Sequence, residues 1–322
     1  MPSLIRSLLA AALSAVSLAA AAAAAYPDRP VVLVNPYAPG GPADVVARSL
    51  ARALEKRLGQ PVVVENKAGG GASIGTGFVA RAKPDGYTLL LGTSAGHVVT
   101  PLMQKTSYDG VQGFAFCSVV AVQPIMLVVN PSRGIKTVQE LIARARAEPG
   151  KLSYGSAGVG GATHLGAELF QQAAHIQLNH IPYAGASPAI NDAVGGQIDL
   201  AMLNLSASLP FIRQGRLVAL AYAADKRSAL LPDVPTLDEA GVAGAQAATW
   251  YSLAAPAGTP ADIVQKLSDT VRTVNEDPEY RRVMQDQAIE LMALSPQDAD
   301  AYVRKDRADM QRLLGTLGLL GK

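Results

Sequence analysis

One segment near the start of the chain has the residue types and spacing of an anion-binding turn. It follows a β-type run at Val31–Val34 and leads into an amphipathic helix that we predict over Ala43–Leu58. Its glycines allow a sharp turn that exposes successive backbone N–H groups, and helix N-termini reached in this way bind small carboxylates and phosphates. The residues of this segment that could contact such an anion are Tyr37, Ala38, Pro39, Gly40, Gly41 and Asp44. The alternatives are that the glycines only turn the chain and that Asp44 only complements the helix dipole.

A second glycine-rich segment, Gly155–His164, repeats this arrangement. It joins a predicted strand at Lys151–Ser156 to a predicted helix at Thr163–Ala174. Two such turns in two halves of the chain could offer two sets of N–H groups to one anionic ligand. The candidate contacts here are Ser156, Gly158, Gly160, Thr163 and His164. We therefore predict that a small anion binds in a cleft between the two halves.

Patterns typical of catalytic and metal sites are missing from the sequence. The run Gly155–Gly158 lacks the Gly-x-Ser-x-Gly spacing of a hydrolase, and no Gly-Lys-Ser/Thr follows it, as a P-loop would require. Cys117 is the one cysteine, so no intrachain disulfide can form, and we expect it to be a small buried side chain at a strand end. The histidines are too scattered for a metal-binding motif; they are His97, His164, His175 and His180. We expect no catalytic residue, no metal and no cofactor.

The first 25 residues have the pattern of a secretory signal peptide. Arg6 is the only charged residue before Asp28, Leu8–Leu18 is apolar, and Ala19–Ala25 offers small residues for cleavage. A transmembrane anchor is the alternative, which the alanine-rich composition disfavours. We predict cleavage after Ala25 and export to the periplasm.

The charge and aromatic content disfavour nucleic acid as a partner. The formal net charge of the whole chain is +2, and loss of Arg6 with the signal peptide lowers it to +1, whereas nucleic-acid binding usually needs a basic face. Aromatic residues are only 5% of the chain, which also disfavours stacking on bases. We expect a monomer with a small-molecule ligand.

Alternating short β-type runs and amphipathic helices predict an α/β architecture. Two longer extended runs, Phe114–Asn130 and Trp250–Pro256, could cross between two lobes, and the chain after Pro260 is helical. Ligands of parallel sheets bind beyond the carboxyl ends of the strands. The loops that we expect to face the cleft are therefore Tyr37–Asp44, Thr93–His97, Ser156–Thr163, Tyr183–Ser187 and Asn204–Ser206.

Several motifs in this order resemble the periplasmic solute-binding proteins of tripartite tricarboxylate transporters, known as the Bug family. Beside the two glycine-rich segments, the matching motifs are Lys83–Gly92, Tyr154–Gly158 with His164-Leu165, His180–Gly185, Leu231–Thr236 and Ala255–Pro260. The resemblance covers nearly all of the chain after the signal peptide.

This resemblance implies a two-lobed α/β periplasmic binding protein of type II, or Venus flytrap, with two crossover strands. The lobe bounds that we expect are residues 26–124 with 251–322 for the first lobe and 125–250 for the second. The implied ligand is a di- or tricarboxylate, an acidic amino acid or an aromatic acid, delivered to the permease subunits of a membrane transporter. Further pocket residues implied by the resemblance, with His97 from its polar loop, are Thr93, Ser94, His97, Tyr183, Gly185, Asp199 and Asn204.

The chain departs from the family pattern in one place. Tyr-Asp-Pro followed by Asp-Phe is expected near residues 108–114, but the sequence there is YDGVQGF, and Cys117 is unusual. These residues lie toward the first crossing, so the departure concerns the hinge more than the ligand.

Two other functions remain open. A secreted hydrolase could use Ser156 or Ser94 with His164 or His97 as its base. A sensor could present its bound solute to a membrane signalling protein, and the sequence cannot separate this role from transport. We expect a receptor rather than an enzyme, with hinge closure of the lobes on the ligand.

Overall fold

The computed structural model describes residues 26–321. The predicted signal peptide, residues 1–25, lies outside the described residues. Among the helices of residues 26–321, none combines the length and the apolar character that crossing a bilayer requires.

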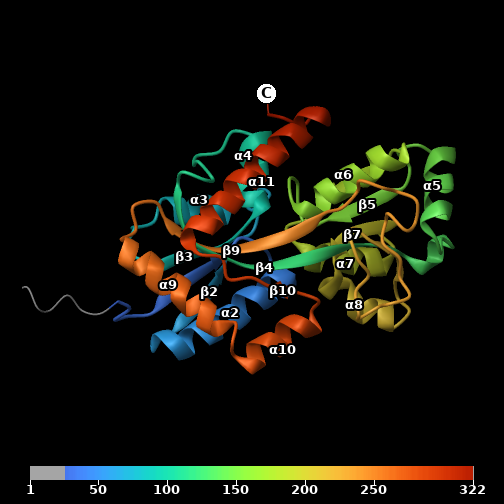
Figure 1. Ribbon diagram of the computed structural model, residues 1–322. Coiled ribbons are helices and arrows are strands. Elements are labelled where there is room, and N and C mark those ends of the chain that lie inside the picture. The colour runs from blue at the N-terminus through green and yellow to red at the C-terminus, as the bar shows by residue number, and fades with distance from the viewer. Residues whose placement is uncertain (1–25, 322) are drawn as a thin grey trace, which may run out of the picture.

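Strands and helices alternate along most of the described chain, as the sequence predicts (Figure 1). The strands are β1 (Val31–Asn35), β2 (Val62–Asn66), β3 (Thr88–Thr93), β4 (Phe114–Val129), β5 (Ser153–Ser156), β6 (Asn179–Pro182), β7 (Leu200–Asn204), β8 (Val218–Tyr222), β9 (Ala248–Pro256) and β10 (Glu290–Leu291). The α-helices are α2 (Pro42–Leu58), α3 (Ser73–Ala80), α4 (Thr100–Met103), α5 (Val138–Ala147), α6 (Ala162–Ala174), α7 (Ala186–Gly195), α8 (Leu205–Arg213), α9 (Ala261–Val274), α10 (Pro278–Asp286) and α11 (Pro296–Thr316). A π-helical turn, η1 (Ala95–Val99), precedes α4, and a 3-10 turn, η2 (Pro131–Arg133), follows β4.

Two long antiparallel strands join two parallel groups of strands. The paired strands follow the order β2-β1-β3-β9-β4-β7-β5-β6. Parallel pairing joins β1 to β2 and β3 in one group, and β5 to β6 and β7 in the other. Residues Phe114–Pro124 of β4 pair with β9, whereas Ile125–Val129 pair with β7 and β8. The predicted crossing at Phe114–Asn130 is thus confirmed as one strand, and Gln123-Pro124 marks the change of partner.

Each group of strands has helices on both faces and its own apolar core. We call the part with β1–β3 and β9 the first lobe, and the part with β5–β8 the second lobe; Figure 1 shows β4 and β9 running between them. In the first lobe Leu50 and Leu54 of α2 and Leu267 of α9 are fully buried. In the second lobe Phe170 of α6 and Leu141 of α5 are buried on the other sheet. The residue bounds expected for the lobes stay a prediction.

The helix bounds follow local sequence signals. Pro42 stands at the first position of α2, where no N–H is needed. The helix ends at Gly59, which adopts φ 70° and donates its N–H to the carbonyl of Glu55. Thr137 and Glu140 form the predicted capping box of α5, with both reciprocal hydrogen bonds present.

Two local expectations are wrong. Thr93–His97 is not a polar loop, because Thr93 ends β3 and the next residues form η1. The reason is burial: His97, Val98 and Val99 are at most 1% exposed, so this segment is part of the core of the first lobe. Cys117 is fully buried, as expected, but it lies within β4 rather than at a strand end.

Candidate ligand-binding site

A small cavity lies between the lobes at the carboxyl ends of the parallel strands. Its volume is about 30 Å³, which is space for about two water molecules. Both lobes contribute to its wall. The lining residues are Tyr37, Ala38, Gly41, Pro42, Ala43, Thr93, Ser94, Ala95, Ala157, Gly161, Ala162, Thr163, Ala186, Asn204, Thr249 and Tyr251. No charged side chain of residues 26–321 is among them.

Four helices of the two lobes begin at this cavity. They are α2 from the first lobe and α6, α7 and α8 from the second, and the first residue of α2, α6 and α7 is part of the wall, as is the N-cap Asn204 of α8. None of the four N-caps makes a side-chain hydrogen bond to its helix. The first N–H groups of a helix have no partner within it, so these termini carry partial positive charge toward the cavity.

Of the six other α-helices in residues 26–321, three have a side-chain N-cap and three do not. Thr137 caps α5, Asp277 caps α10 and Ser295 caps α11, each by accepting a backbone N–H bond. The other three, α3, α4 and α9, begin without a side-chain cap, so it is the meeting of four termini at one place that sets α2, α6, α7 and α8 apart. The four uncapped termini at one cavity therefore form a site at which an anion could accept the remaining N–H bonds.

The first glycine-rich loop is held in shape by Asp44. Its Oδ2 atom accepts hydrogen bonds from the Gly40 N–H at 3.0 Å and from Arg48 Nε at 2.8 Å, and its Oδ1 accepts from Asn66 Nδ2 at 3.0 Å. Burial acts to raise the pKa of Asp44, but these hydrogen bonds hold it below its ordinary value. Asp44 does not line the cavity; it fixes the backbone that does.

Hydroxyl and amide groups form the uncharged floor of the cavity. Tyr37 Oη and Thr93 Oγ1 are 2.9 Å apart, and Asn204 Nδ2 donates to Thr249 Oγ1 at 3.0 Å. Tyr251 donates to the amide oxygen of Gln123 at 3.1 Å. Burial raises the pKa of Tyr37 and of Tyr251, so both phenols stay neutral. The floor can thus donate and accept hydrogen bonds without adding charge.

The second glycine-rich loop is held by its own side chains. Thr163 Oγ1 accepts from the Ala157 N–H at 3.0 Å, and His164 Nδ1 accepts from the Gly160 N–H at 3.2 Å. Burial lowers the pKa of His164 to about 4, so the imidazole is neutral and can accept this bond. Of the predicted residues in this segment, only Thr163 lines the small cavity.

A larger cavity of about 460 Å³ adjoins the small one and shares Tyr37 and Ala157 with it. Gly158 and Tyr183, both predicted from sequence, line this larger cavity together with the Gly69–Ala72 loop of the first lobe. The lobes touch beside it, because the Ala38 N–H donates to the carbonyl of Ala184 at 3.2 Å. A side chain at Gly185, whose φ is 154°, would come within 3.3 Å of the Ala38 nitrogen. The contact therefore depends on glycine.

The remaining loop residues of the prediction lie beside the cavity rather than on its wall. The carbonyl of Pro39 accepts from Ser187 Oγ at 3.3 Å, which is another contact between the lobes. Ser156 is fully buried and its Oγ lies 2.7 Å from Nε2 of His180. Neither Ser156 nor His180 lines either cavity.

His97 lies outside the site, which corrects its placement as a pocket residue. It is fully buried, its Nδ1–H donates to the Gly110 carbonyl at 2.7 Å, and its Nε2 lies 3.3 Å from Ser252 Oγ. Its ring also contacts Phe114 and Phe116 edge to face. Burial lowers the pKa of His97 to about 4, so it is a neutral core residue.

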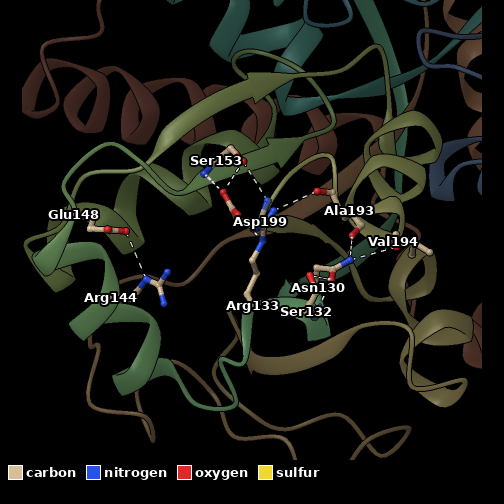
Figure 2. A network of polar contacts seen from close by, with 10 residues as sticks. Asn130, Ser132, Arg133, Arg144, Glu148, Ser153, Ala193, Val194 and Asp199 are labelled. Carbon is tan, nitrogen blue, oxygen red and sulfur yellow. Dashed lines mark hydrogen bonds and ion pairs between the residues drawn. The ribbon is translucent and has the colours of Figure 1, made fainter.

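Asp199 is also misplaced by the prediction. It lies at the start of β7, at the opposite edge of the sheet from Asn204. Figure 2 shows its carboxylate bound by the N–H and hydroxyl of Ser153, with Arg133 beside it; Arg133 Nε is 2.6 Å from Asp199 Oδ1. Asp199 therefore ties η2 to β5 and β7. A parallel strand places only its carboxyl end at the cleft, and Asp199 precedes β7, so the direction of the strand already argued against a pocket position.

Thr249 and Tyr251 are wall residues that the sequence analysis missed. They stand two apart on β9, so their side chains lie on the same face of the strand. The signal that could have identified them as wall residues is a pair of polar side chains two residues apart in an otherwise apolar strand. The alanines of the wall, Ala43, Ala95, Ala162 and Ala186, give no such signal, because an alanine side chain carries no functional group.

The geometry of a hydrolase is missing within residues 26–321. Ser94 Oγ donates to Asp306 at 2.5 Å and has no histidine partner, whereas Ser156 is sealed from both cavities. No group of three or more His, Cys, Asp or Glu side chains in the described part of the chain has the arrangement of a metal site.

Comparison with known proteins gives a consistent result. The sequence profile of the family described as "Tripartite tricarboxylate transporter family receptor" matches residues 46–319. Protein BugT of Bordetella pertussis is 39% identical over 262 residues, which cover 81% of this chain and 79% of that protein.

Solved structures of similar proteins have the same fold. The Rhodopseudomonas palustris protein Rpa4515 with adipate has a TM-score of 0.89 at 33% identity, covering 92% of this chain and 100% of that one. MatC from the same organism, with bound malate, has a TM-score of 0.86 at 29% identity, covering 90% and 100%. A periplasmic arginine-binding protein at 12% identity, with a TM-score of 0.52, shares the fold alone. The α/β periplasmic binding protein fold expected from the sequence is confirmed.

Acidification is expected to destabilise the fold through the buried histidines. A histidine whose pKa is lowered on folding stabilises the protein above its ordinary pKa of 6.5, and this contribution is lost as the pH falls toward the folded value of about 4. For the fully buried His97 the loss is about 3 kcal/mol. Urea unfolding followed at several pH values should show it. His97→Gln should flatten the profile, and the exposed His175→Asn should not; equal profiles for all three proteins would contradict the assignment.

Gly92→Ala is expected to destabilise the protein by about 3 kcal/mol, because a Cβ there would overlap Nε2 of His97 and Oγ of Ser252. Gly195→Ala is the matched control, since its Cβ would meet nothing closer than 4.0 Å and lies at the end of a helix. Chemical denaturation measures both variants. A Gly92→Ala protein as stable as the control would show that His97 can move away.

Proposed function

The chain belongs to the tripartite tricarboxylate transporter receptor family, and we propose that it captures a small organic acid in the interlobe cavity for delivery to membrane permease subunits. The observation that supports this proposal best is the convergence of α2, α6, α7 and α8 on that cavity with no side-chain caps. The family consists of receptors, so the chain is a binding protein rather than an enzyme.

The proposed binding mode places one carboxylate of the ligand between the termini of α2 and α6. Their first N–H groups would donate to the carboxylate oxygens, and the hydroxyls of Thr93, Thr163 and Tyr37 would bind directly or through water. The rest of the ligand would extend past Tyr37 and Ala157 into the larger cavity. Adipate and malate are bound by two relatives, which supports a dicarboxylate or a related organic acid as the class of ligand here.

Ligand entry in this proposal needs the lobes to separate. The small cavity has only about 30 Å³ of space and the lobes are in contact at Ala38 and Ala184. The bend would occur where β4 and β9 cross, near Gln123-Pro124, between a first lobe of residues 26–124 and 251–322 and a second lobe of residues 125–250. Hinge closure of this kind is the usual motion of two-lobed binding proteins.

The cellular setting is part of the same proposal. The relatives of known structure include a periplasmic transporter protein, and we place this chain in the periplasm as a monomer after cleavage behind Ala25. Presentation of the bound acid to a signalling protein is the alternative to delivery. The two differ in the membrane partner and not in the ligand site.

Organic acids are expected to raise the unfolding temperature of the protein that begins at Tyr26. A ligand at about 100 times its Kd adds about 2.7 kcal/mol of stability. The measurement is thermal unfolding with malate, adipate, succinate, glutamate, benzoate and a neutral sugar as the control, after refolding to remove carried-over ligand. A shift with acids alone supports the proposal. No shift with any acid, or an equal shift with the sugar, would refute carboxylate capture.

Ala162→Asp is expected to abolish acid binding without unfolding the protein. The new carboxylate would stand at the first position of α6, on the cavity wall, where it would occupy the anion site and repel the ligand. An acidic residue in the first turn stabilises a helix by about 0.3–1 kcal/mol. Ala261→Asp, at the first position of α9 and away from the cavity, is the matched control.

Calorimetric titration with the acid that gives the largest thermal shift would compare the two variants. Affinity should fall by more than about a hundredfold in Ala162→Asp, since two carboxylates cannot share one site in their ionised forms. Unchanged binding in a folded Ala162→Asp protein would place the ligand elsewhere.

A further inference from the structure

Ser94 lines both the small cavity and a third cavity. This third cavity has a volume of about 180 Å³ and lies between α6 of the second lobe and α11 of the first. Figure 1 shows α11 running above β9, on the side of the molecule where α6 also lies. Ser94 belongs to the walls of both cavities and is only 7% exposed.

Asp306 of α11 contacts Ser94 at the wall of this third cavity. Ser94 Oγ donates its proton to Asp306 Oδ2 at 2.5 Å. A hydroxyl has one proton to donate, so Ser94 cannot at the same time donate to a ligand in the small cavity. While Asp306 is ionised, only the lone pairs of Ser94 Oγ can face a ligand anion. Lone pairs accept hydrogen bonds and an anion has none to donate, so this contact is unfavourable.

The groups around Asp306 do not provide a positive charge in direct contact. On α11 itself, Lys305 and Asp309 lie near it with opposite effects, and Tyr302 lies on the same side. From β9, the indole N–H of Trp250 lies near Asp306 without reaching hydrogen-bond geometry, and His97 stacks behind that indole. The α6 residues on the cavity wall are the uncharged Ala162, Leu165 and Leu169.

We propose that Asp306 is a positioning residue for the ligand site, and that its protonation turns the Ser94 hydroxyl from Asp306 toward the bound acid. Protonated Asp306 has its own O–H, which donates to Ser94 Oγ. The Ser94 proton is then free to donate to the ligand carboxylate, and the negative charge behind the site is removed. This inference rests on the proposed function and specifies how the pH regulates it.

The sign of the coupling follows from the charge change. Burial raises the pKa of Asp306 above its ordinary value of 3.8, while the hydrogen bond from Ser94 opposes the shift. A ligand that prefers protonated Asp306 binds more tightly as the pH falls toward this raised pKa, and by reciprocity the bound ligand raises that pKa further. Binding should therefore take up a proton, over and above any proton taken up by the ligand itself.

The test measures the affinity of adipate and of malate by calorimetry from about pH 7.5 down to the lowest pH at which circular dichroism shows the protein folded. The proteins are the wild type, Asp306→Asn, Ser94→Ala and Asp309→Asn. Titration of the ligand itself is common to all four proteins, so the ratio of each variant to the wild type isolates the effect of the protein. Asp309→Asn is the matched control, because it removes the same charge one turn further along α11 from a carboxylate that already pairs with Lys305.

Wild type and Asp309→Asn should gain about tenfold more affinity on acidification than Asp306→Asn, the effect of one charge-assisted hydrogen bond. Asp306→Asn should bind about tenfold more tightly than the wild type near pH 7.5 for the same reason. Ser94→Ala should gain less affinity on acidification than the wild type, because only the loss of the Asp306 charge remains.

An Asp306→Asn or Ser94→Ala protein with the wild-type pH profile would overturn the inference. If Asp306→Asn does not fold, the pH profile of Ser94→Ala alone decides between the two results. Failure of both acids to bind any of the four proteins would reject the proposed function as well, which separates the two outcomes.

Discussion

The antiparallel pairing of β4 with β9 is the constraint on which the rest of the structure depends. These strands pair from Phe114 opposite Pro256 to Pro124 opposite Ala248, and β4 then continues into the sheet of the second lobe. In the first lobe β3 pairs with β9, and in the second lobe β7 pairs with β4. The carboxyl ends of both parallel groups therefore face the same cleft. Gln123 holds the crossing from within: it is fully buried, it accepts from Tyr251, and it donates to Ser206 Oγ at 2.6 Å. One buried amide thus links the cavity floor to α8.

The arrangement of the strands determines the electrostatics of the site. A helix that follows a strand begins at the strand's carboxyl end, so the crossing brings four helix N-termini to one point. Each terminus carries about half a positive charge, and together they can replace the arginine or lysine that a buried anion usually needs. The fold holds the backbone dipoles in place, whereas a buried lysine would add the free-energy cost of removing its own charge from water. Asp44 lies behind the wall without lining it, and Arg48 pairs with its carboxylate at 2.8 Å, so its charge is balanced within α2.

The sequence predicted the fold better than it predicted the wall of the site. The glycines of both loops, the cap at Gly59 and the length of β4 follow from local rules that need no knowledge of tertiary contacts. Tyr37, Thr93 and Asn204 line the small cavity, and each stands just after or at the end of a strand, which is the signal that the sequence offers. His97 was misplaced because packing decides which side of η1 faces the core, and no local pattern records this. Asp199 was misplaced because its pocket role came from the family resemblance, although its position before β7 puts it at the strand end away from the cleft. Asp306 could not have been found, since 212 residues separate it from Ser94.

The close approach of the lobes explains why glycines rather than functional side chains dominate the loops. A Cβ at Gly71 would overlap the carbonyl of Val159 in the other lobe, and one at Gly160 would come within 3.1 Å of Thr100 Oγ1. The lobes can therefore meet backbone to backbone, which closes the cavity over a ligand without burying additional polar side chains. Specificity must then come from the few side chains that do reach the cavities, because backbone N–H groups bind every carboxylate alike. In this chain those side chains are neutral, so the shape and hydrogen bonding of the larger cavity, rather than a second charge, decide which acid fits.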